Sequence, residues 1–278
     1  MKIAISTDSA VDITEEIKKQ YNIHVVPLTI LMGDEIYLDG ERPITDIFEY
    51  VNKTKKLPKT SAVNEMQYKE HFNSLLKSYD AIIHISMASF ASCSYNNAIA
   101  AANGCNNIVV IDSKSLSTGI TLQCMKAYEL TLKNKNLKEI EKEILNIVPK
   151  TQVSLILKSV NYLHKGGRCS GLQLFGANLL NLKPMVILDG KQIKLKKKYR
   201  GNMESVAKNY IMELFETNPN PNLENVFITY TSATPGMIEI SRKLLKTRGF
   251  KNIYEATTNS TIACHSGEYA MGIIFLNN

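Results

Sequence analysis

I-S-T-D-S-A-V-D, residues Ile5–Asp12, is the stretch that decides the fold. It begins in a short apolar run typical of a buried strand and continues into a turn rich in hydroxyl and carboxyl groups. Asp12 and Glu15 resemble a capping box, which predicts a helix from Ile13. A strand that passes directly into a helix is the unit of an α/β sheet, and ligands of such sheets bind at the carboxyl ends of the strands.

The rest of the first half repeats this alternation of short apolar runs and amphipathic stretches. Such a rhythm predicts a parallel sheet with helices on both faces, and we expect it to form an N-terminal α/β domain over residues 1–150. The expected strands are Ile3–Ser6, His24–Met32, Ala81–Ser86 and Ile108–Asp112, and the expected helices cover Met66–Ser78 and begin at Tyr95.

The pattern changes near residue 150, after a periodic helix at Leu137–Val148 that ends at Pro149. Lys183–Leu188 and Lys191–Tyr199 flank Asp189-Gly190, the favoured pair for a two-residue hairpin turn. We therefore expect residues 151–278 to form a second α/β domain with a mixed sheet. Its other expected strands are Val153–Leu157, Val226–Thr231 and Asn252–Thr257, and its expected helices are Met203–Phe215 and Gly236–Thr247.

The composition excludes several classes of protein. A chain of 278 residues with 44% hydrophobic and 21% charged residues is globular rather than disordered or fibrous. Its five scattered cysteines form no CxxC pair, which argues against a disulfide framework and a zinc finger. The net charge of +7 comes without a nucleic-acid-binding motif, so we expect an anionic small ligand or an acidic protein partner and no nucleic acid. The sequence shows neither a signal peptide nor a membrane span, so we expect a cytoplasmic protein without stable membrane insertion.

Hydroxyl-rich or glycine-rich loops follow several of the expected strands. Hydroxyl groups and free backbone N–H groups at helix starts suit anions, although ordinary helix capping explains any one such loop. The loops are Thr7-Asp8-Ser9, Thr60-Ser61, Ser89 to Ser94, Asp112-Ser113 with Ser117-Thr118-Gly119, His164 to Arg168, and Cys264 to Gly267.

Taken in this order, the segments resemble the DegV family of bacterial fatty-acid-binding proteins, the carrier subunits of fatty acid kinase. The resemblance covers nearly the whole chain, and the ordered set is specific although no single string decides it. The matching segments are Ile5–Asp12, V-P-L at Val26–Leu28, Y-L-D-G at Tyr37–Gly40, T-S at Thr60-Ser61, A-S-F-A-S-C-S-Y at Ala88–Tyr95, I-D-S at Ile111–Ser113, G-G-R at Gly166–Arg168, L-L-N-L-K-P at Leu179–Pro184, D-G at Asp189-Gly190, K-Y-R at Lys198–Arg200, and His265.

The resemblance implies a two-domain DegV-like fold and a carrier that catalyses no reaction itself. It implies one bound long-chain fatty acid, no cofactor, and a separate kinase subunit that phosphorylates the carboxylate, so that acyl phosphate reaches phospholipid synthesis. By matching position, Thr60 and Ser92 would hold the carboxylate. The family's glycine and threonine in the second loop fall on Cys93 and Ser94, so the head-group loop departs from the family pattern there.

Ser61, Arg168 and His265 complete the candidate binding residues. Arg168 follows two glycines and suits a carboxylate or acyl phosphate, with a surface turn as its alternative. His265 is a candidate head-group donor or base, or a buried histidine satisfied by its neighbours. Cys264 and Cys93 lack the spacing of metal ligands, so we expect no metal site. Glu268 stands near where the family carries a Gly-Pro-Gly run, and its charge is unfavourable beside a phosphate.

Two further stretches leave alternatives open. Lys194, Lys196, Lys198 and Arg200 alternate so as to share one face of a strand, either as a protected sheet edge or as a docking surface. An apolar stretch is a candidate lining for an acyl tunnel, with core packing as the default reading. Its members are Leu172, Leu174, Phe175, Leu179, Leu180, Leu182 and Met185.

The rival hypothesis is a serine esterase. It would use Ser92 or Ser94 as nucleophile and His265 as base, oriented by Asp8 or Asp112. The chain contains no G-x-S-x-G nucleophile elbow and no P-loop or kinase signature, so we rank the carrier above the esterase.

Overall fold

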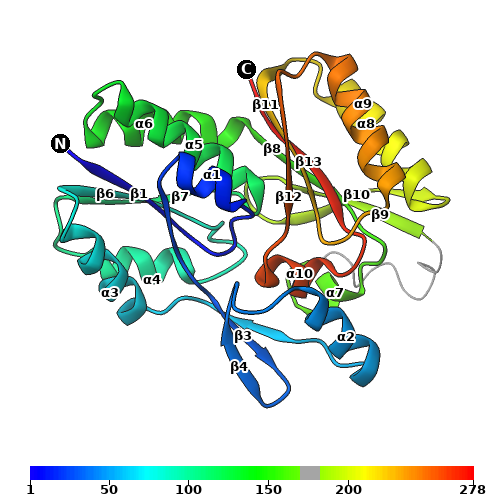
Figure 1. Ribbon diagram of the computed structural model, residues 1–278, viewed down its shortest axis with the longest axis horizontal. Helices are drawn as coiled ribbons and strands as arrows, with labels where there is room; N and C mark the ends of the chain where they lie inside the picture. The colour runs from blue at the N-terminus through cyan, green and yellow to red at the C-terminus, as the bar shows by residue number, and fades with distance from the viewer. Residues whose placement is uncertain (170–181) are drawn as a thin grey trace.

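A computed structural model describes residues 1–169 and 182–278. Its elements alternate along the chain as the sequence pattern predicts (Figure 1). The strands are β1 Ile3–Asp8, β2 Ile23–Val26, β3 Thr29–Met32, β4 Glu35–Leu38, β5 Lys59–Ser61, β6 Ala81–Ser86, β7 Ile108–Asp112, β8 Thr151–Ile156, β9 Leu182–Leu188, β10 Ile193–Arg200, β11 Pro221–Tyr230, β12 Asn252–Thr257 and β13 Met271–Asn277. The helices are α1 Glu15–Gln20, α2 Thr45–Thr54, α3 Glu65–Leu76, α4 Ser94–Ala101, α5 Thr118–Leu132, α6 Leu137–Ile147, a 3₁₀ turn Val148–Lys150, α7 Asn161–Lys165, α8 Met203–Thr217, α9 Pro235–Arg248 and α10 Ser260–Ser266.

The first sheet has the strand order β2-β1-β6-β7, and every pair in it is parallel. Figure 1 shows α5 and α6 on one side of this sheet and α3 and α4 on the other. The expected parallel sheet with helices on both faces is confirmed. Its strands β1 and β6 are buried at every position because both faces are covered.

The second sheet has the order β10-β9-β8-β13-β11-β12 and is mixed, as expected. Only β11 and β12 pair in parallel within its described strands, and α8 and α9 cover one of its faces. Helix α5 packs against β1 and β6 of the first sheet and against β8, β11 and β13 of the second. Its first eight residues are all buried, since the two sheets leave it no solvent face.

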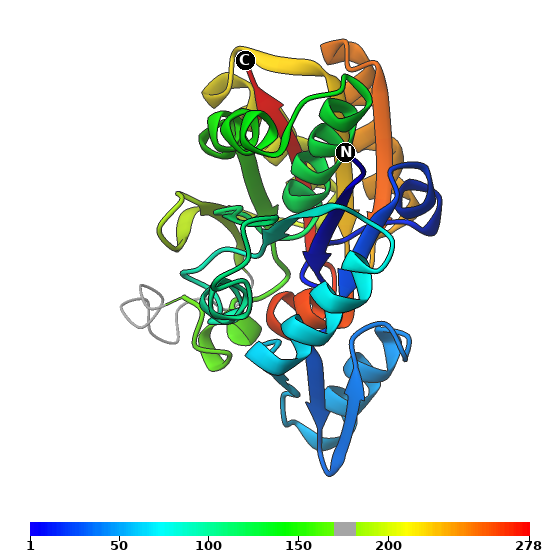
Figure 2. The ribbon, with the colours of Figure 1, turned by 90° about the vertical axis from the view of Figure 1, so that its left-hand side faces the viewer.

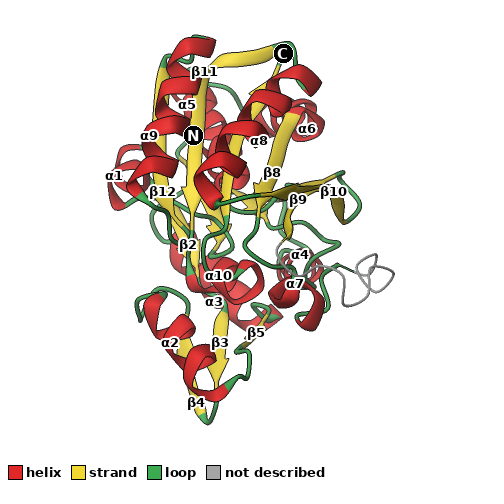
Figure 3. Cartoon of the chain, turned by 90° about the vertical axis from the view of Figure 1, so that its right-hand side faces the viewer, coloured by secondary structure: helices red, strands yellow, loops and turns green. Residues whose placement is uncertain are grey.

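A third sheet, β4-β3-β5, forms a small lobe with α2 at the bottom of Figures 2 and 3. Here one expectation was wrong, because His24–Met32 is not one strand. Pro27 interrupts it, so β2 joins the first sheet and β3 joins the small sheet. The division matters because β5, which pairs with β3, carries Thr60 and Ser61. Figure 3 shows α10 between this lobe and the rest of the molecule.

Three local predictions were also wrong. Helix α1 begins at Glu15 with Thr14 as its cap, because the Asp12 carboxylate bonds other groups. The β9–β10 turn spans residues 189–192 instead of two, since Asp189 accepts hydrogen bonds from the backbone N–H groups of Lys191 and Gln192. A bulge between Leu195 and Lys197 shifts the register of β10, so the expected row of cations is split between the two faces of the strand.

Strand β13 was missed, although it lies between β8 and β11. No helix within the described ranges is long and apolar enough to cross a bilayer.

Candidate functional site

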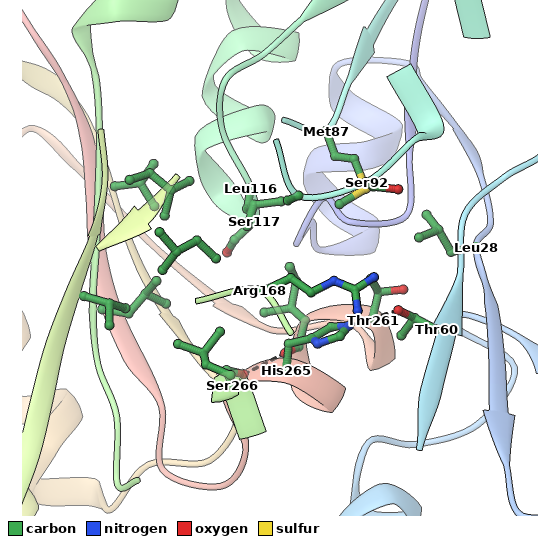
Figure 4. A pocket seen from close by; sticks show the side chains of 18 of the residues that line it. Leu28, Thr60, Met87, Ser92, Leu116, Ser117, Arg168, Thr261, His265 and Ser266 are labelled. Carbon is green, nitrogen blue, oxygen red and sulfur yellow. Dashed lines mark hydrogen bonds between the residues drawn. The ribbon is translucent and has the colours of Figure 1, made fainter. Parts of the chain in front are cut away.

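A cavity of about 300 Å³ lies where the small sheet, α10 and the second sheet meet the loops that follow β6 and β7 (Figure 4). Its walls combine a larger apolar part with a group of polar side chains. The lining residues are Leu28, Thr60, Ser61, Ala62, Met87, Ala91, Ser92, Cys93, Leu116, Ser117, Val153, Leu155, Leu157, Leu163, Arg168, Val186, Leu188, Ile193, Thr261, Ile262, His265 and Ser266.

One apolar wall is a face of the second sheet. Val153 and Leu155 stand two residues apart on β8 and therefore point the same way. Leu155 pairs with Val186 of β9, and Leu188 of β9 pairs with Ile193 of β10, so these side chains share that face. The wall is continuous across three strands.

Of the stretch expected as a candidate tunnel lining, the structure describes only Leu182 and Met185. Leu172, Leu174, Phe175, Leu179 and Leu180 lie outside the described residues. Leu182 is not among the lining residues, and Met185 packs instead in the core beneath α8. Met185 alternates with Val186 along β9, so it occupies the opposite face of the strand.

The polar part of the cavity gathers residues from four distant segments. Thr60 and Ser61 come from β5, Ser92 from the β6–α4 loop, and His265 from α10. Figure 4 shows the Arg168 guanidinium between Ser92 and His265, on the same side as Thr60. Ser61 and Arg168 are exposed, so this part of the cavity opens to solvent.

Thr60 and His265 are joined directly: Thr60 Oγ1 lies 2.9 Å from His265 Nε2. Burial, with the positive charge of Arg168, lowers the pKa of His265 to about 4. The ring is therefore neutral at pH 7, and Arg168 supplies the positive charge. Nδ1 of His265 is buried and has no hydrogen-bond partner within the described residues.

The two glycines before Arg168 serve different purposes. A Cβ at Gly166 would stand 2.5 Å from His265 Nδ1, so only glycine allows the loop this close to the ring. Gly167 has a φ of +71°, in the left-handed region where a side chain is strained. Arg168 then turns back and donates from Nη1 to the Gly166 carbonyl at 2.6 Å. The Gly-Gly-Arg string thus fits the loop against α10.

Ser94 lies behind Ser92 and does not line the cavity. It is fully buried at the start of α4, its backbone N–H donates to Ser92 Oγ at 3.1 Å, and the two hydroxyl oxygens lie 3.0 Å apart. These bonds fix Ser92. Cys93, between them, is exposed and lines the cavity.

The Asp8 carboxylate, which the first motif supplies, holds the loop that carries Ser92. It accepts from Ser86 Oγ at 2.9 Å and from the Met87 backbone N–H at 2.8 Å. Burial raises the pKa of Asp8 to about 6. Through these hydrogen bonds Asp8, at the end of β1, fixes the start of the β6–α4 loop. Asp8 itself does not line the cavity.

Glu268, Cys264 and Cys93, which the sequence analysis singled out, lie in ordinary surroundings. Glu268 pairs with Lys158 at 3.4 Å. Cys264 is buried in the core of the small lobe while Cys93 is exposed. In the part of the chain that the structure describes, no group of three or more potential ligands is placed to hold a metal ion.

The hydrogen bonds do not connect a serine, a histidine and a carboxylate among the described residues. The two candidate serines bond each other, and His265 bonds Thr60. Asp8 bonds the β6–α4 loop, and Asp112 accepts from the Ser89 backbone N–H at 3.1 Å. The arrangement expected of the esterase hypothesis is not formed.

The model of a family described as "Uncharacterised protein, DegV family" matches residues 2–278. The chain belongs to the DegV family. A DegV domain-containing protein of Caldanaerobacter subterraneus is 29% identical over 277 residues, covering 99% of this chain and 98% of the relative.

Solved DegV structures share the fold. A DegV family protein from Thermus thermophilus, described by its fatty acid binding, has a TM-score of 0.92 at 23% identity, with both chains covered completely. DegV from Bacillus subtilis, described as a fatty acid binding protein, has a TM-score of 0.85 at 28% identity, also over both complete chains. The Streptococcus pneumoniae Fatty Acid Kinase (Fak) B3 protein, loaded with linoleic acid, has a TM-score of 0.86 at 20% identity over both complete chains.

Proposed function

We propose that this DegV protein binds one long-chain fatty acid and presents its carboxyl head to a fatty acid kinase, without catalysing a reaction itself. The observation that carries the proposal is the division of one cavity into apolar walls and a polar, solvent-open part beside Thr60, Ser92 and Arg168. That division matches a ligand with a long apolar tail and an anionic head. The fatty acid binding described for the Bacillus subtilis relative supports the same ligand class.

The tail should supply most of the affinity. Burial of a methylene group contributes about 0.8 kcal/mol, so a long tail contributes on the order of 10 kcal/mol before the costs of ordering and association. Hydrogen bonds to a charged head contribute only about 1.5–3 kcal/mol each. Thr60 and Ser92 therefore orient the carboxylate, while the wall formed by β8, β9 and β10 retains the ligand.

The kinase step is supported by the likeness to the Fak B3 protein and by the open polar end of the cavity. In this proposal the catalytic subunit of a fatty acid kinase reaches the carboxylate there, and the resulting acyl phosphate enters phospholipid synthesis in the cytoplasm. Arg168 offers a fixed positive charge, which gains importance once phosphate adds negative charge. Ser61, Cys93 and His265 complete the head-group region.

We also propose that residues 1–150 and 151–278 are the two domains of the chain. The support is that the first sheet and the small sheet come from residues before 113, while the second sheet begins at Thr151. The cavity would then lie between the domains, where ligands are commonly bound.

The head-group roles are tested by two variants beside wild type. Thr60→Val with Ser92→Ala removes both hydroxyl donors and should weaken or misorient bound fatty acid. Arg168→Ala should leave tail-driven binding largely intact and impair phosphorylation by a kinase subunit from the same genome. Fatty acid retention and kinase-dependent turnover are measured on all three proteins. If Arg168→Ala abolishes retention while phosphorylation per bound ligand stays normal, Arg168 does not act at the phosphoryl-transfer stage.

A further inference from the structure

The amino end of α10 is held by two carboxylates from the first forty residues of the chain. The Asn259 backbone N–H donates to Asp12 Oδ1 at 2.8 Å. The next two backbone N–H groups donate to Asp39, from Ser260 to Oδ1 at 2.8 Å and from Thr261 to Oδ2 at 3.1 Å. Asn259 makes no side-chain cap of its own, so distant carboxylates replace the local one.

Helix α10 depends on such support. It has seven residues, too few to be stable in isolation. Nevertheless it carries four of the lining residues, Thr261, Ile262, His265 and Ser266. Because His265 meets Thr60 of the small sheet at 2.9 Å, the placement of α10 decides whether that contact forms.

The two carboxylates lie in a buried environment that is unfavourable for charged groups. Asp12 is fully buried and Asp39 is 8% exposed. Burial, together with the negative charge of Asp39, raises the pKa of Asp12 to about 7. Burial raises the pKa of Asp39 as well. The other groups that bond the Asp12 carboxylate, the hydroxyls of Ser117 and Thr229, are neutral. Two buried acids close enough to repel each other oppose stability, so a role in positioning α10 accounts for them better than a role in stabilising the fold.

We propose that Asp12 and Asp39 are positioning residues of the head-group site: they hold the amino end of α10 and so set His265 against Thr60. The partial positive charge of a helix amino end favours two carboxylates there. Ser9 Oγ donates to Asp39 at 2.9 Å, which ties the support back to the Ile5–Asp12 motif. The proposal rests on the proposed function only in naming the ligand head as a fatty acid carboxylate.

The test is Asp39→Asn, which keeps the side-chain shape but replaces one accepting oxygen with a donor. Its control is Tyr210→Phe, which removes buried hydrogen bonds to Ser154 and Ile273 in the core away from the cavity. Imidazole signals of the histidines are followed by NMR during a pH titration, and oleate affinity is measured on the same proteins. Asp39→Asn should move the His265 pKa from about 4 towards its ordinary 6.5 and weaken oleate binding by about two- to tenfold. Tyr210→Phe should lose stability but leave the His265 pKa and the oleate affinity unchanged.

An unchanged His265 pKa in folded Asp39→Asn would overturn the proposal. If that variant does not fold, Asp12→Asn takes its place with the same readout. If neither variant folds, the carboxylates serve the fold rather than the site, and the proposal is wrong. If the wild-type protein binds no oleate but the His265 pKa still shifts in Asp39→Asn, the proposed function is wrong and the positioning inference holds.

Discussion

The change of Gly166 to alanine separates the geometry of the head-group site from general stability. The new Cβ would stand 2.5 Å from His265 Nδ1 and 2.8 Å from the Tyr162 carbonyl oxygen. Since the carbonyl belongs to the backbone of α7, the histidine ring has to move. Overpacking of this kind costs about 1–3 kcal/mol of folding stability, and the lost contact with Thr60 costs about 1 kcal/mol more.

Gly167→Ala is the matched control. It has the same chemistry one residue later, and its Cβ would meet no heavy atom within 4 Å. Its φ of +71° makes alanine strained by about 1–2 kcal/mol, so this variant also loses stability. Both variants should therefore unfold at lower urea concentrations than wild type, Gly166→Ala at the lowest, while only Gly166→Ala disturbs His265.

The assay is calorimetric titration with oleate, beside urea denaturation of each protein. Loss of the Thr60–His265 arrangement should weaken binding by about five- to tenfold in Gly166→Ala and by less than twofold in Gly167→Ala. Equal oleate affinities for the two variants would refute the claim that the Gly-Gly-Arg loop shapes the head-group site through His265.

Two further predictions follow from burial. Burial lowers the pKa of His71 to about 4, so as the pH falls from about 6.5 to about 4 the unfolded chain takes up a proton that the folded chain does not. The stability contributed by this group is present above pH 6.5 and is lost across that window. His71→Gln should therefore reduce the slope of unfolding free energy against pH on the acid side by up to about 1.4 kcal/mol per pH unit. Urea midpoints of variant and wild type that change in parallel at pH 7, 6 and 5 would contradict this. Val153 is 3% exposed, lines the cavity and lies against the first turn of α5. The larger ring of Val153→Phe would therefore fill part of the cavity and shift the bound ligand towards shorter chains. Each displaced methylene group should weaken binding about fourfold. An unchanged distribution of chain lengths by mass spectrometry would place Val153 outside the tail path.

The strands and helices with strong periodicity were predictable, and Ala81–Ser86, Ile108–Asp112 and Asn252–Thr257 match their predicted bounds. The His24–Met32 run was misread because apolar character does not reveal that Pro27 divides it between two sheets. The position of strand β13 between β8 and β11 depends on pairing with strands distant in the sequence. No local turn signal like Asp189-Gly190 predicts this strand.

The candidate site was predictable where the family resemblance supplied residues and not where packing did. Thr60 and His265 were both named, although nothing local shows that two residues 205 positions apart form one hydrogen bond. The lining residues Val153, Leu155 and Leu157 carry a period-two signal within their strand segment that could have identified one cavity wall. The use of Asp39 at the amino end of α10 has no sequence signal, because it depends on the docking of the small lobe.

The most direct test of the central claim is native mass spectrometry of protein purified from a bacterial host, followed by denaturation of the same sample. We expect the native mass to exceed the chain mass by one long-chain fatty acid, which denaturation releases. Protein that is empty in repeated preparations and that does not gain this mass when long-chain fatty acids are added would contradict the carrier function.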